Sequence, residues 1–388
     1  MRIVMLSAES LHSICSGGLG VHVTELAASL HRRGHELHVI TRRKEGQNDY
    51  DDIDGVYYHR IDHSLSENFV ECMDNMCKAM AHRFHEVTSM IGPFDRIHAH
   101  DWQAANAMKY VMDGFGIPSV FTMHSTEYGR DGNVFFDGFA RQVRDIESAG
   151  CHNASIVIAV SHFLADELHR IYQVPQDKIH VVPNGVNYQV FNGFINPAEV
   201  KGRYGIAPMA PTIFASGRMT VQKGMDLLIE AVPMILAAYP DVRFIICGDG
   251  PEKDAVIRRA CEVGVADAVV FPGHVPRGPY IDLMRACDIL AVPSRNEPFG
   301  IVVLEGWAAG KPVVATTAGG PREFVWHDVN GFLVDPSPGG IAHGIGSLLA
   351  DHDHCRALGA NGRRAVEEKF NWDNVAAYTE GVYQATVC

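Results

Sequence analysis

The sequence predicts an α/β protein with two doubly wound parallel sheets, each covered by helices on both faces. Two observations support this prediction. The chain has 388 residues, which exceeds the size that a single hydrophobic core usually serves. It also contains two separate series in which short apolar runs alternate with amphipathic segments, the pattern of strands and helices in a parallel sheet. We therefore expect two domains, at residues 1–190 and 191–369.

The first series begins at the N-terminus. A strand at 2–7 precedes a glycine turn at 16–20 and a helix with one apolar face. Gly34 follows this helix, at a position that favours glycine because the backbone there turns left-handed. The acidic stretch 49–54 is predicted to be a solvated turn. An amphipathic segment at 69–84 and strands at 37–41, 96–99 and 119–123 complete the series.

The second series begins at Pro211 and repeats the order of strand, helix, strand and glycine loop. Its predicted strands lie at 212–216, 242–247, 268–271, 289–292, 312–315 and 332–334, with a helix at 226–238. The segments 182–186 and 193–211 contain proline and glycine and are predicted to form a hinge between the domains.

Composition and charge exclude several classes of protein. With 47% hydrophobic and 20% charged residues the chain is not disordered, and a net charge of −13 disfavours nucleic-acid binding. The first 190 residues hold 16 Lys and Arg against 24 Asp and Glu, which also disfavours an anionic membrane surface.

No apolar stretch reaches the ~18 residues of a membrane span, and the first residues do not resemble a signal peptide. Nine cysteines, an odd number without a CxxC pair, fit reduced thiols. We expect a cytoplasmic location and no membrane insertion, and the oligomeric state is left open.

Gly17 and Gly18 lie in the turn between the first strand and the first helix. Amides at a helix N-terminus favour an anion such as a diphosphate. A dinucleotide site is an alternative, but the GxGxxG spacing and the later acidic residue are missing. The second strand ends at Arg42 and Arg43, so an NADP site stays open, as does a purely structural turn.

Arg218 and Lys223 flank a short loop just beyond the strand at 212–216. In open α/β sheets, ligands bind at the carboxyl ends of the strands. Two cations there can hold a pyrophosphate and stabilise the negative charge that develops on a leaving group. A solvated pair of surface cations is the alternative.

Glu297 and Glu305 follow the strand at 289–292. A helix is predicted to begin near Phe299, with Glu305 about two turns inside it, and its first amides can bind phosphate. We expect the two carboxylates to lie too far apart for the ~5 Å pair of a retaining glycosidase. Each then accepts hydrogen bonds from sugar hydroxyls separately. A carboxylate that merely complements the helix dipole is an alternative for Glu297 but does not explain Glu305.

Together these motifs resemble a family 4 retaining glycosyltransferase of GT-B fold, a group that includes glycogen and sucrose-phosphate synthases. The resemblance rests on Gly17-Gly18, Gly217-Arg218 with Lys223-Gly224, the loop 247–251, and the E-x7-E segment from Glu297 to Glu305, and it spans nearly the whole chain. It implies two Rossmann-like domains that face each other across a cleft. Residues 182–187 resemble the family's linker, with Asn187 in place of the usual Asp, and 370–388 resemble the helix that crosses back to the first domain.

The resemblance also implies roles for individual residues. Arg218 and Lys223 would bind the donor diphosphate, Glu297 the donor sugar and Glu305 the ribose. His124 would lie near the reacting centre, and Asp101 and Trp102, in a His-Asp-Trp element, would lie on the acceptor side. The backbone of Gly17, Gly18, Gly250, Phe299, Gly300 and Ile301 would contact the donor.

The implied activity is transfer of a hexosyl unit, glucosyl by preference, from a UDP or ADP sugar to a hydroxyl of a sugar, glucan or small molecule, with retention. Cys15-Ser16 stand where glycogen synthases tend to have a lysine, so the chain departs from that subgroup. No cofactor and no metal are expected, because the pairs His98/His100, His82/His85 and His352/His354 lack completing ligands. The alternatives are an NADP oxidoreductase that uses Arg42 or Arg43 and a catalytically silent sugar-nucleotide sensor.

Overall fold

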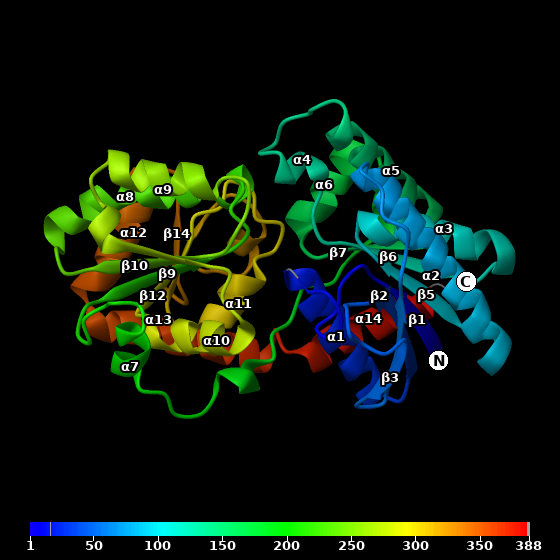
Figure 1. Cartoon of the computed structure of the whole chain (residues 1–388). Coiled ribbons are helices and arrows are strands. Elements are labelled where there is room, and N and C mark those ends of the chain that lie inside the picture. The colour runs from blue at the N-terminus through cyan, green and yellow to red at the C-terminus, as the bar shows by residue number, and fades with distance from the viewer. Residues whose placement is uncertain (16, 386–388) are drawn as a thin grey trace. The chain divides into compact units, whose positions relative to one another are not determined.

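The computed structural model describes residues 1–15 and 17–385, and the chain divides into two compact units. The first unit contains Met1–Asn184 and the segment that begins at Trp372, and the second contains Gly185–Asn371 (Figure 1). The predicted hinge at 193–211 is wrong in part, because this segment contains helix α7 (Pro197–Gly202), which packs on α10 (Arg277–Ala286) of its own unit.

The first unit contains an eight-stranded sheet within the described residues, in the order β3-β4-β2-β1-β5-β6-β7-β8. All neighbours are parallel except β3 and β4. The strands are β1 (Arg2–Leu6), β2 (Glu36–Arg42), β3 (Tyr50–Ile53), β4 (Val56–Ile61), β5 (Arg96–His100), β6 (Ser119–Met123), β7 (Ile156–Ala159) and β8 (Ile179–Val181). The helices are α1 (Gly18–Arg32), α2 (Phe69–Ile91), α3 (Trp102–Phe115), α4 (Glu127–Arg130), α5 (Phe139–Asn153), α6 (His162–Tyr172) and α14 (Trp372–Ala385).

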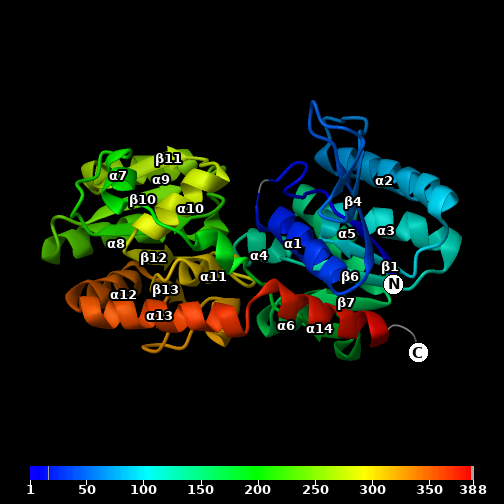
Figure 2. The ribbon, with the colours of Figure 1, turned by 90° about the horizontal axis from the view of Figure 1, so that it is seen from below.

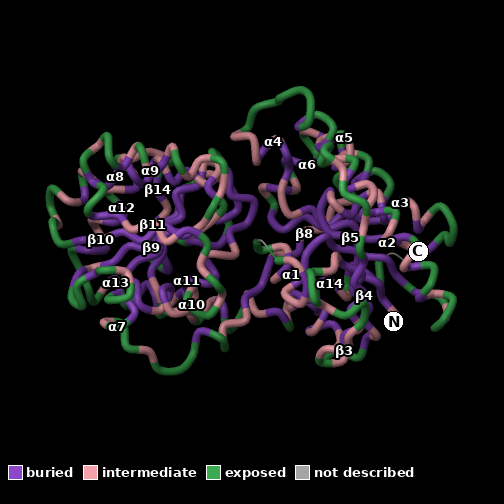
Figure 3. The backbone as a smooth tube through the Cα atoms, in the orientation of Figure 1, coloured by how far each residue is buried: buried purple, intermediate pink, exposed green. Residues whose placement is uncertain are grey.

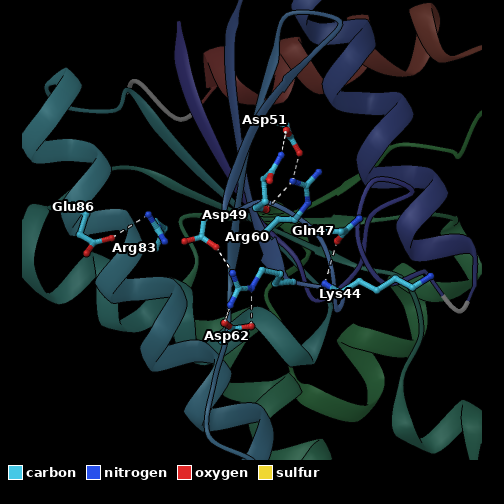
Figure 4. Close-up of polar contacts among 10 residues, drawn as sticks. Lys44, Gln47, Asp49, Asp51, Arg60, Asp62, Arg83 and Glu86 are labelled. Atoms are coloured by element: carbon cyan, nitrogen blue, oxygen red, sulfur yellow. Dashed lines mark hydrogen bonds and ion pairs between the residues drawn. The ribbon is translucent and has the colours of Figure 1, made fainter.

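The edge of this sheet corrects the predicted solvated turn at 49–54. Tyr50–Ile53 form strand β3, which pairs antiparallel with β4. Two of the acidic side chains have cation partners that favour pairing: Asp51 pairs with the buried Arg60, and Asp49 pairs with Arg43, which also binds Asp62 (Figure 4). Strand propensity alone did not reveal this, since the cations lie outside the acidic stretch, just after β2 and on β4.

Helices cover both faces of the first sheet, and α14 completes one of them. Val120 of β6 belongs to the core that also includes Leu26 of α1 and Val375 of α14. The next residue, Phe121, points to the opposite face, where it meets Gly150 of α5. Helix α14 lies beside α1 although some 340 residues separate them in sequence (Figure 2). This confirms the prediction that the C-terminal helix returns to the first domain.

The second unit contains a six-stranded parallel sheet within the described residues, in the order β11-β10-β9-β12-β13-β14. The strands are β9 (Thr212–Ser216), β10 (Arg243–Cys247), β11 (Val269–Gly273), β12 (Ile289–Val292), β13 (Val313–Thr316) and β14 (Phe332–Val334). Besides α7 and α10, the helices are α8 (Met225–Ala238), α9 (Lys253–Glu262), α11 (Ile301–Ala308), α12 (Pro338–Ala350) and α13 (His352–Glu368). Most strands of both sheets are buried, whereas the edge strands β3 and β8, the loops and the outer helix faces are more exposed (Figure 3).

Alternating side chains place the helices of the second unit on two faces. Ile213 of β9 belongs to the core with residues of α8 and α12. Phe214, the next residue, contacts Tyr280 of α10, and Leu290 of β12 contacts Gly306 of α11. Both units are therefore doubly wound α/β layers, as the sequence predicts.

Two further observations concern the chain as a whole. The eight cysteines within the described residues are all free thiols. Among the described residues there is no helix that combines the length and apolarity needed to span a membrane.

Candidate active site

Lys223 and Glu297 meet at the carboxyl end of the second sheet. Lys223 Nζ donates to Glu297 Oε2 over 2.7 Å, and the Ser294 hydroxyl donates to the same oxygen over 2.9 Å. Glu297 is only 5% exposed, so its charge depends on these two donors. The sequence places these residues 74 positions apart, and the adjacency of β9 and β12 in the sheet brings their loops together.

Arg218 lies on the β9 loop with Lys223 and is exposed. Within the part of the chain that the structure describes, it forms no ion pair. Its guanidinium is therefore available to an anion from outside the chain. Lys223 differs, because an incoming anion has to compete with Glu297 for its ammonium group.

Two glycine loops pack so closely that no side chain fits between them. The Gly217 amide donates to the Cys247 carbonyl, and the Met219 amide donates to the Asp249 carbonyl. A Cβ on Gly248, whose φ is +135°, would lie 1.9 Å from the Gly217 oxygen, and one on Gly250 would lie 2.4 Å from the Met219 oxygen. Gly250, predicted to contact the donor, thus also fixes the loop that presents Arg218.

The Glu297 segment is anchored before the helix begins. Glu297 pairs through its backbone with Ala318 and Gly320, and a Cβ on Gly319 would lie 2.1 Å from the Glu297 oxygen. The helix predicted to begin near Phe299 begins at Ile301, because Gly300 adopts a left-handed φ of +97°. Glu305 therefore lies about one turn inside the helix instead of two.

The three predicted backbone contacts of this segment lie at the start of α11. Gly300 is the N-cap and offers no side-chain cap to the first turn, although the Val303 amide donates to its carbonyl. The Phe299 side chain is buried and stacks on Phe324, with ring centroids 4.9 Å apart. The Phe299 ring thus holds the segment in the core and leaves its backbone groups for a ligand, so the backbone contacts of this segment stay a prediction.

Glu305 has a partner that the sequence did not reveal. The Tyr280 hydroxyl donates to Glu305 Oε2 over 2.6 Å and lies 3.2 Å from the Ser216 hydroxyl. Burial raises the pKa of Glu305 above its ordinary value, an effect that the Tyr280 hydrogen bond opposes. Glu297 and Glu305 therefore have separate sets of partners, in line with separate roles.

The first unit holds the remaining predicted residues. Gly17 is the N-cap of α1, and Gly18 is its first residue, so the predicted glycine turn is in part the first turn of the helix. Ser16 lies outside the described residues. A Cβ on Gly20 would lie 2.6 Å from Cys15 Sγ, which explains why glycine is needed there.

Arg42 and Arg43, the basis of the NADP alternative, already have partners. Arg42 Nε donates to the Ala8 carbonyl over 2.7 Å, and Arg43 is bound between Asp49 and Asp62. Through these hydrogen bonds and ion pairs, the two guanidinium groups connect the end of β2 to neighbouring segments of the first unit.

Asp101 and Trp102 lie where β5 passes into α3. Asp101 has a left-handed φ of +61°, and its Oδ1 is buried without a hydrogen-bond partner. Burial raises the pKa of its carboxyl to about 7, although Arg130 opposes the shift. Trp102 is 5% exposed and contacts Phe69 and Phe139, so its ring is part of the packed interior.

His124 follows directly after β6. Its ring lies edge-on to His22, with centroids 4.6 Å apart, and stacks on His100 at 5.8 Å. Burial lowers the pKa of His124 well below its ordinary value, so the ring is neutral at pH 7. Its Nε2 is buried and has no hydrogen-bond partner.

Two family models match the chain, one for each unit. Residues 16–190 match the model described as Glycosyltransferase Family 4, and residues 198–365 match the one described as Glycosyl transferases group 1. An uncharacterised glycosyltransferase of Methanocaldococcus jannaschii is 33% identical over 99% of this chain and 98% of its own length. The chain belongs to the family 4 glycosyltransferases.

Solved structures of glycosyltransferases share the fold. Sucrose-phosphate synthase of Thermosynechococcus elongatus has a TM-score of 0.83 at 23% identity and covers 99% of this chain and 98% of that one. Anabaena HepE, solved with UDP-glucose, has a TM-score of 0.80 at 21% identity and covers 99% and 100%. The glycosyltransferase thus has the GT-B architecture of two Rossmann-like domains, as the sequence predicts.

Several residues that shape this glycosyltransferase's candidate site were not predicted from the sequence. Ser294 follows β12 by two positions, and this location at the end of a strand could have identified it as a site residue from the sequence. Arg295 forms a bidentate ion pair with Asp226 that fixes the loop between Ser294 and Glu297. Tyr280 and His22 lie inside helices, where nothing in the local sequence separates a ligand-facing side chain from a core one.

Proposed function

We propose that this glycosyltransferase moves a hexosyl unit, glucosyl by preference, from UDP or ADP to a hydroxyl of a sugar, glucan or small molecule, with retention at the anomeric carbon. The observation that supports the proposal most is the contact between Lys223 and Glu297 beside the exposed Arg218. It combines a cation for the diphosphate with a carboxylate for the sugar hydroxyls. The complex of Anabaena HepE with UDP-glucose supports the choice of a nucleotide-linked glucose.

In the proposed reaction the acceptor oxygen attacks the anomeric carbon on the face from which the diphosphate departs. The bond between the anomeric carbon and the phosphate oxygen breaks, and that oxygen takes the hydroxyl proton. Arg218 and Lys223 stabilise the negative charge that grows on the leaving group. Such stabilisation lowers the barrier only if it is stronger in the transition state than with bound substrate.

The remaining side chains have binding roles in this proposal. Glu297 orients Lys223 and accepts hydrogen bonds from the sugar, while Glu305, held by Tyr280, accepts from the ribose hydroxyls. The first amides of α11 bind phosphate oxygens, because the N-terminus of a helix favours anions. His124, which is neutral, lies near the reacting centre, and Asp101 with Trp102 shapes the acceptor side.

Neither alternative function is retained. Family membership and the partners of Arg42 and Arg43 oppose an NADP oxidoreductase. The M. jannaschii relative is itself named a glycosyltransferase, and Arg218, Lys223 and Glu297 are all present, which opposes a silent sensor.

The test is a panel of UDP, ADP and GDP sugars, each incubated with and without simple sugars and glucans. Release of nucleoside diphosphate that rises several-fold with one acceptor supports transfer, and NMR of the product defines its anomeric configuration. An inverted product would overturn the retaining mechanism. Absence of release from every donor would overturn the transferase proposal as a whole.

A further inference from the structure

Three histidines of the first unit converge at the carboxyl edge of its sheet. His22 comes from the second turn of α1, His100 is the last residue of β5, and His124 follows β6. One ring nitrogen of each lies within 4.8 Å of those of the other two. These residues are 24 to 102 positions apart in sequence, so no local motif predicts the cluster.

The nitrogens that face this cluster have no protein partner. His22 Nε2, both ring nitrogens of His100 and His124 Nε2 are buried without a hydrogen bond. His22 and His100 are 3% and 0% exposed. Buried polar atoms are normally satisfied, and each unsatisfied one is costly, so four in one place indicate a missing binding partner.

The tautomer of His22 is set by its neighbour. His22 Nδ1 lies 2.7 Å from Asn184 Oδ1, and an amide oxygen can only accept. Nδ1 therefore donates, and Nε2 keeps its lone pair directed away from Asn184. A hydrogen bond of this kind on the second ring nitrogen is the usual companion of a metal-bound histidine.

The adjacent His98 provides an internal contrast. Its ring lies only 4.0 Å from that of His100, but Nδ1 bonds to the Tyr383 hydroxyl and Nε2 to Thr122 Oγ1. Both nitrogens of His98 are therefore satisfied within the protein, whereas the nitrogens that His22, His100 and His124 direct into the cluster are not.

We propose that His22, His100 and His124 form a binding site for a divalent transition-metal ion, with Zn²⁺ as the preferred occupant. Three imidazoles suit Zn²⁺ and leave a fourth position for solvent. Zn–N bonds of about 2.0–2.1 Å place tetrahedral nitrogens about 3.4 Å apart, so the widest pair closes by on the order of 1 Å on binding. The ion would link α1 to the ends of β5 and β6 and hold the His124 ring in place.

The test uses the full-length protein without a histidine tag. After chelator treatment and reloading with Zn²⁺, elemental analysis should find about one Zn²⁺ per chain, and Co²⁺ should give the visible absorption of a tetrahedral site. Substitution of both His22 and His100 by alanine should abolish binding. The matched control, His82→Ala with His85→Ala, removes an exposed pair from α2 of the same unit and should leave the ratio unchanged.

A second variant covers the case in which the buried substitutions unfold the protein. Asn184→Ala keeps all three imidazoles but removes the hydrogen bond that orients His22, and should weaken Zn²⁺ binding about 10–100-fold. Unchanged affinity in Asn184→Ala, or no Zn²⁺ binding tighter than about 10 μM by the natural sequence, would overturn the site. These measurements do not involve nucleotide sugars, so they stand or fall independently of the proposed transfer reaction.

Discussion

The Tyr280 hydroxyl of helix α10 donates a 2.6 Å hydrogen bond to Glu305 of helix α11. The two helices are consecutive in the chain and lie on the same face of the second sheet. The bond keeps a buried carboxylate satisfied at the place where we propose that ribose binds, and Ser216 at the end of β9 joins the same tyrosine. We therefore expect both folding and the proposed ribose binding to depend on the same hydroxyl.

Tyr280→Phe should destabilise the second unit by about 1–3 kcal/mol, because it leaves the buried Glu305 without its donor. Thermal and urea unfolding monitored by circular dichroism measure this loss. Tyr378→Phe is the control, since the Tyr378 side chain is 57% exposed and should change stability little. Equal stability of both variants would contradict the importance of the bond.

Glu305→Gln should weaken binding of the nucleoside diphosphate about 10-fold or more, because ribose hydroxyls lose a charged acceptor. Titration calorimetry with UDP and ADP gives the dissociation constant directly. The effect should appear mainly in donor affinity and less in turnover. A variant that binds both nucleotides with unaltered affinity would disprove the ribose assignment.

Lys223→Ala should lower turnover by about 10²–10³, since it removes a cation that stabilises the departing diphosphate. The control is Lys311→Ala, which removes a lysine just before β13, at the opposite end of the same sheet. Initial rates of nucleotide release, measured at saturating donor, compare the two. Near-normal turnover of Lys223→Ala would eliminate the proposed role.

Gly248→Ala should disrupt the loop that presents Arg218, because the new Cβ would lie 1.9 Å from the Gly217 oxygen and the backbone there is left-handed. We expect a loss of at least about 2 kcal/mol of stability together with weaker donor binding. Gly202→Ala is matched to it, since nothing lies within 4 Å of the Cβ added at Gly202. If both variants unfold at the same urea concentration, the two loops are less tightly packed than described.

Asp101→Asn should change how stability depends on pH. The folded pKa of Asp101 is about 7, above its ordinary value near 3.8, so between these values the folded protein holds a proton that the unfolded chain releases. Ionisation of this buried carboxyl therefore lowers the free energy of unfolding progressively as the pH rises from about 4 to 7, by up to about 4 kcal/mol. Above about pH 7 the loss is constant. Asparagine tolerates the left-handed backbone and removes this dependence. The urea midpoint of the variant should exceed that of the natural sequence by more at pH 8 than at pH 5.

Most of the architecture follows from local sequence. The predicted strands at 119–123, 212–216, 289–292 and 332–334 coincide with β6, β9, β12 and β14, because buried strands of a parallel sheet are short apolar runs. Strands β4, β7 and β8 were not predicted. In β4 the polar His59 and Arg60 interrupt the apolar pattern, and distant partners make their burial possible.

The sequence identified the main charged residues of the candidate site, but it did not identify their contacts. Glycine loops and strand-end charges identify Arg218, Lys223 and Glu297, since their positions depend on the local order of strand, loop and helix. The ion pair between Lys223 and Glu297, the role of Tyr280 and the meeting of His22 with His100 depend on which strands are neighbours. That order is a property of the folded sheet, and a single sequence does not display it.

Because α14 belongs to the first unit, the second unit is an insertion that the chain enters after Asn184 and leaves before Trp372. During synthesis, the elements of the first unit up to Asn184 emerge first and those of the second unit follow, but the first unit stays incomplete until α14 emerges after them. Until then Leu26 and Val120 lack their cover by Val375, so the half that was translated first is the one that finishes last. Premature termination near residue 370 would accordingly yield a folded second unit tethered to an aggregation-prone first one.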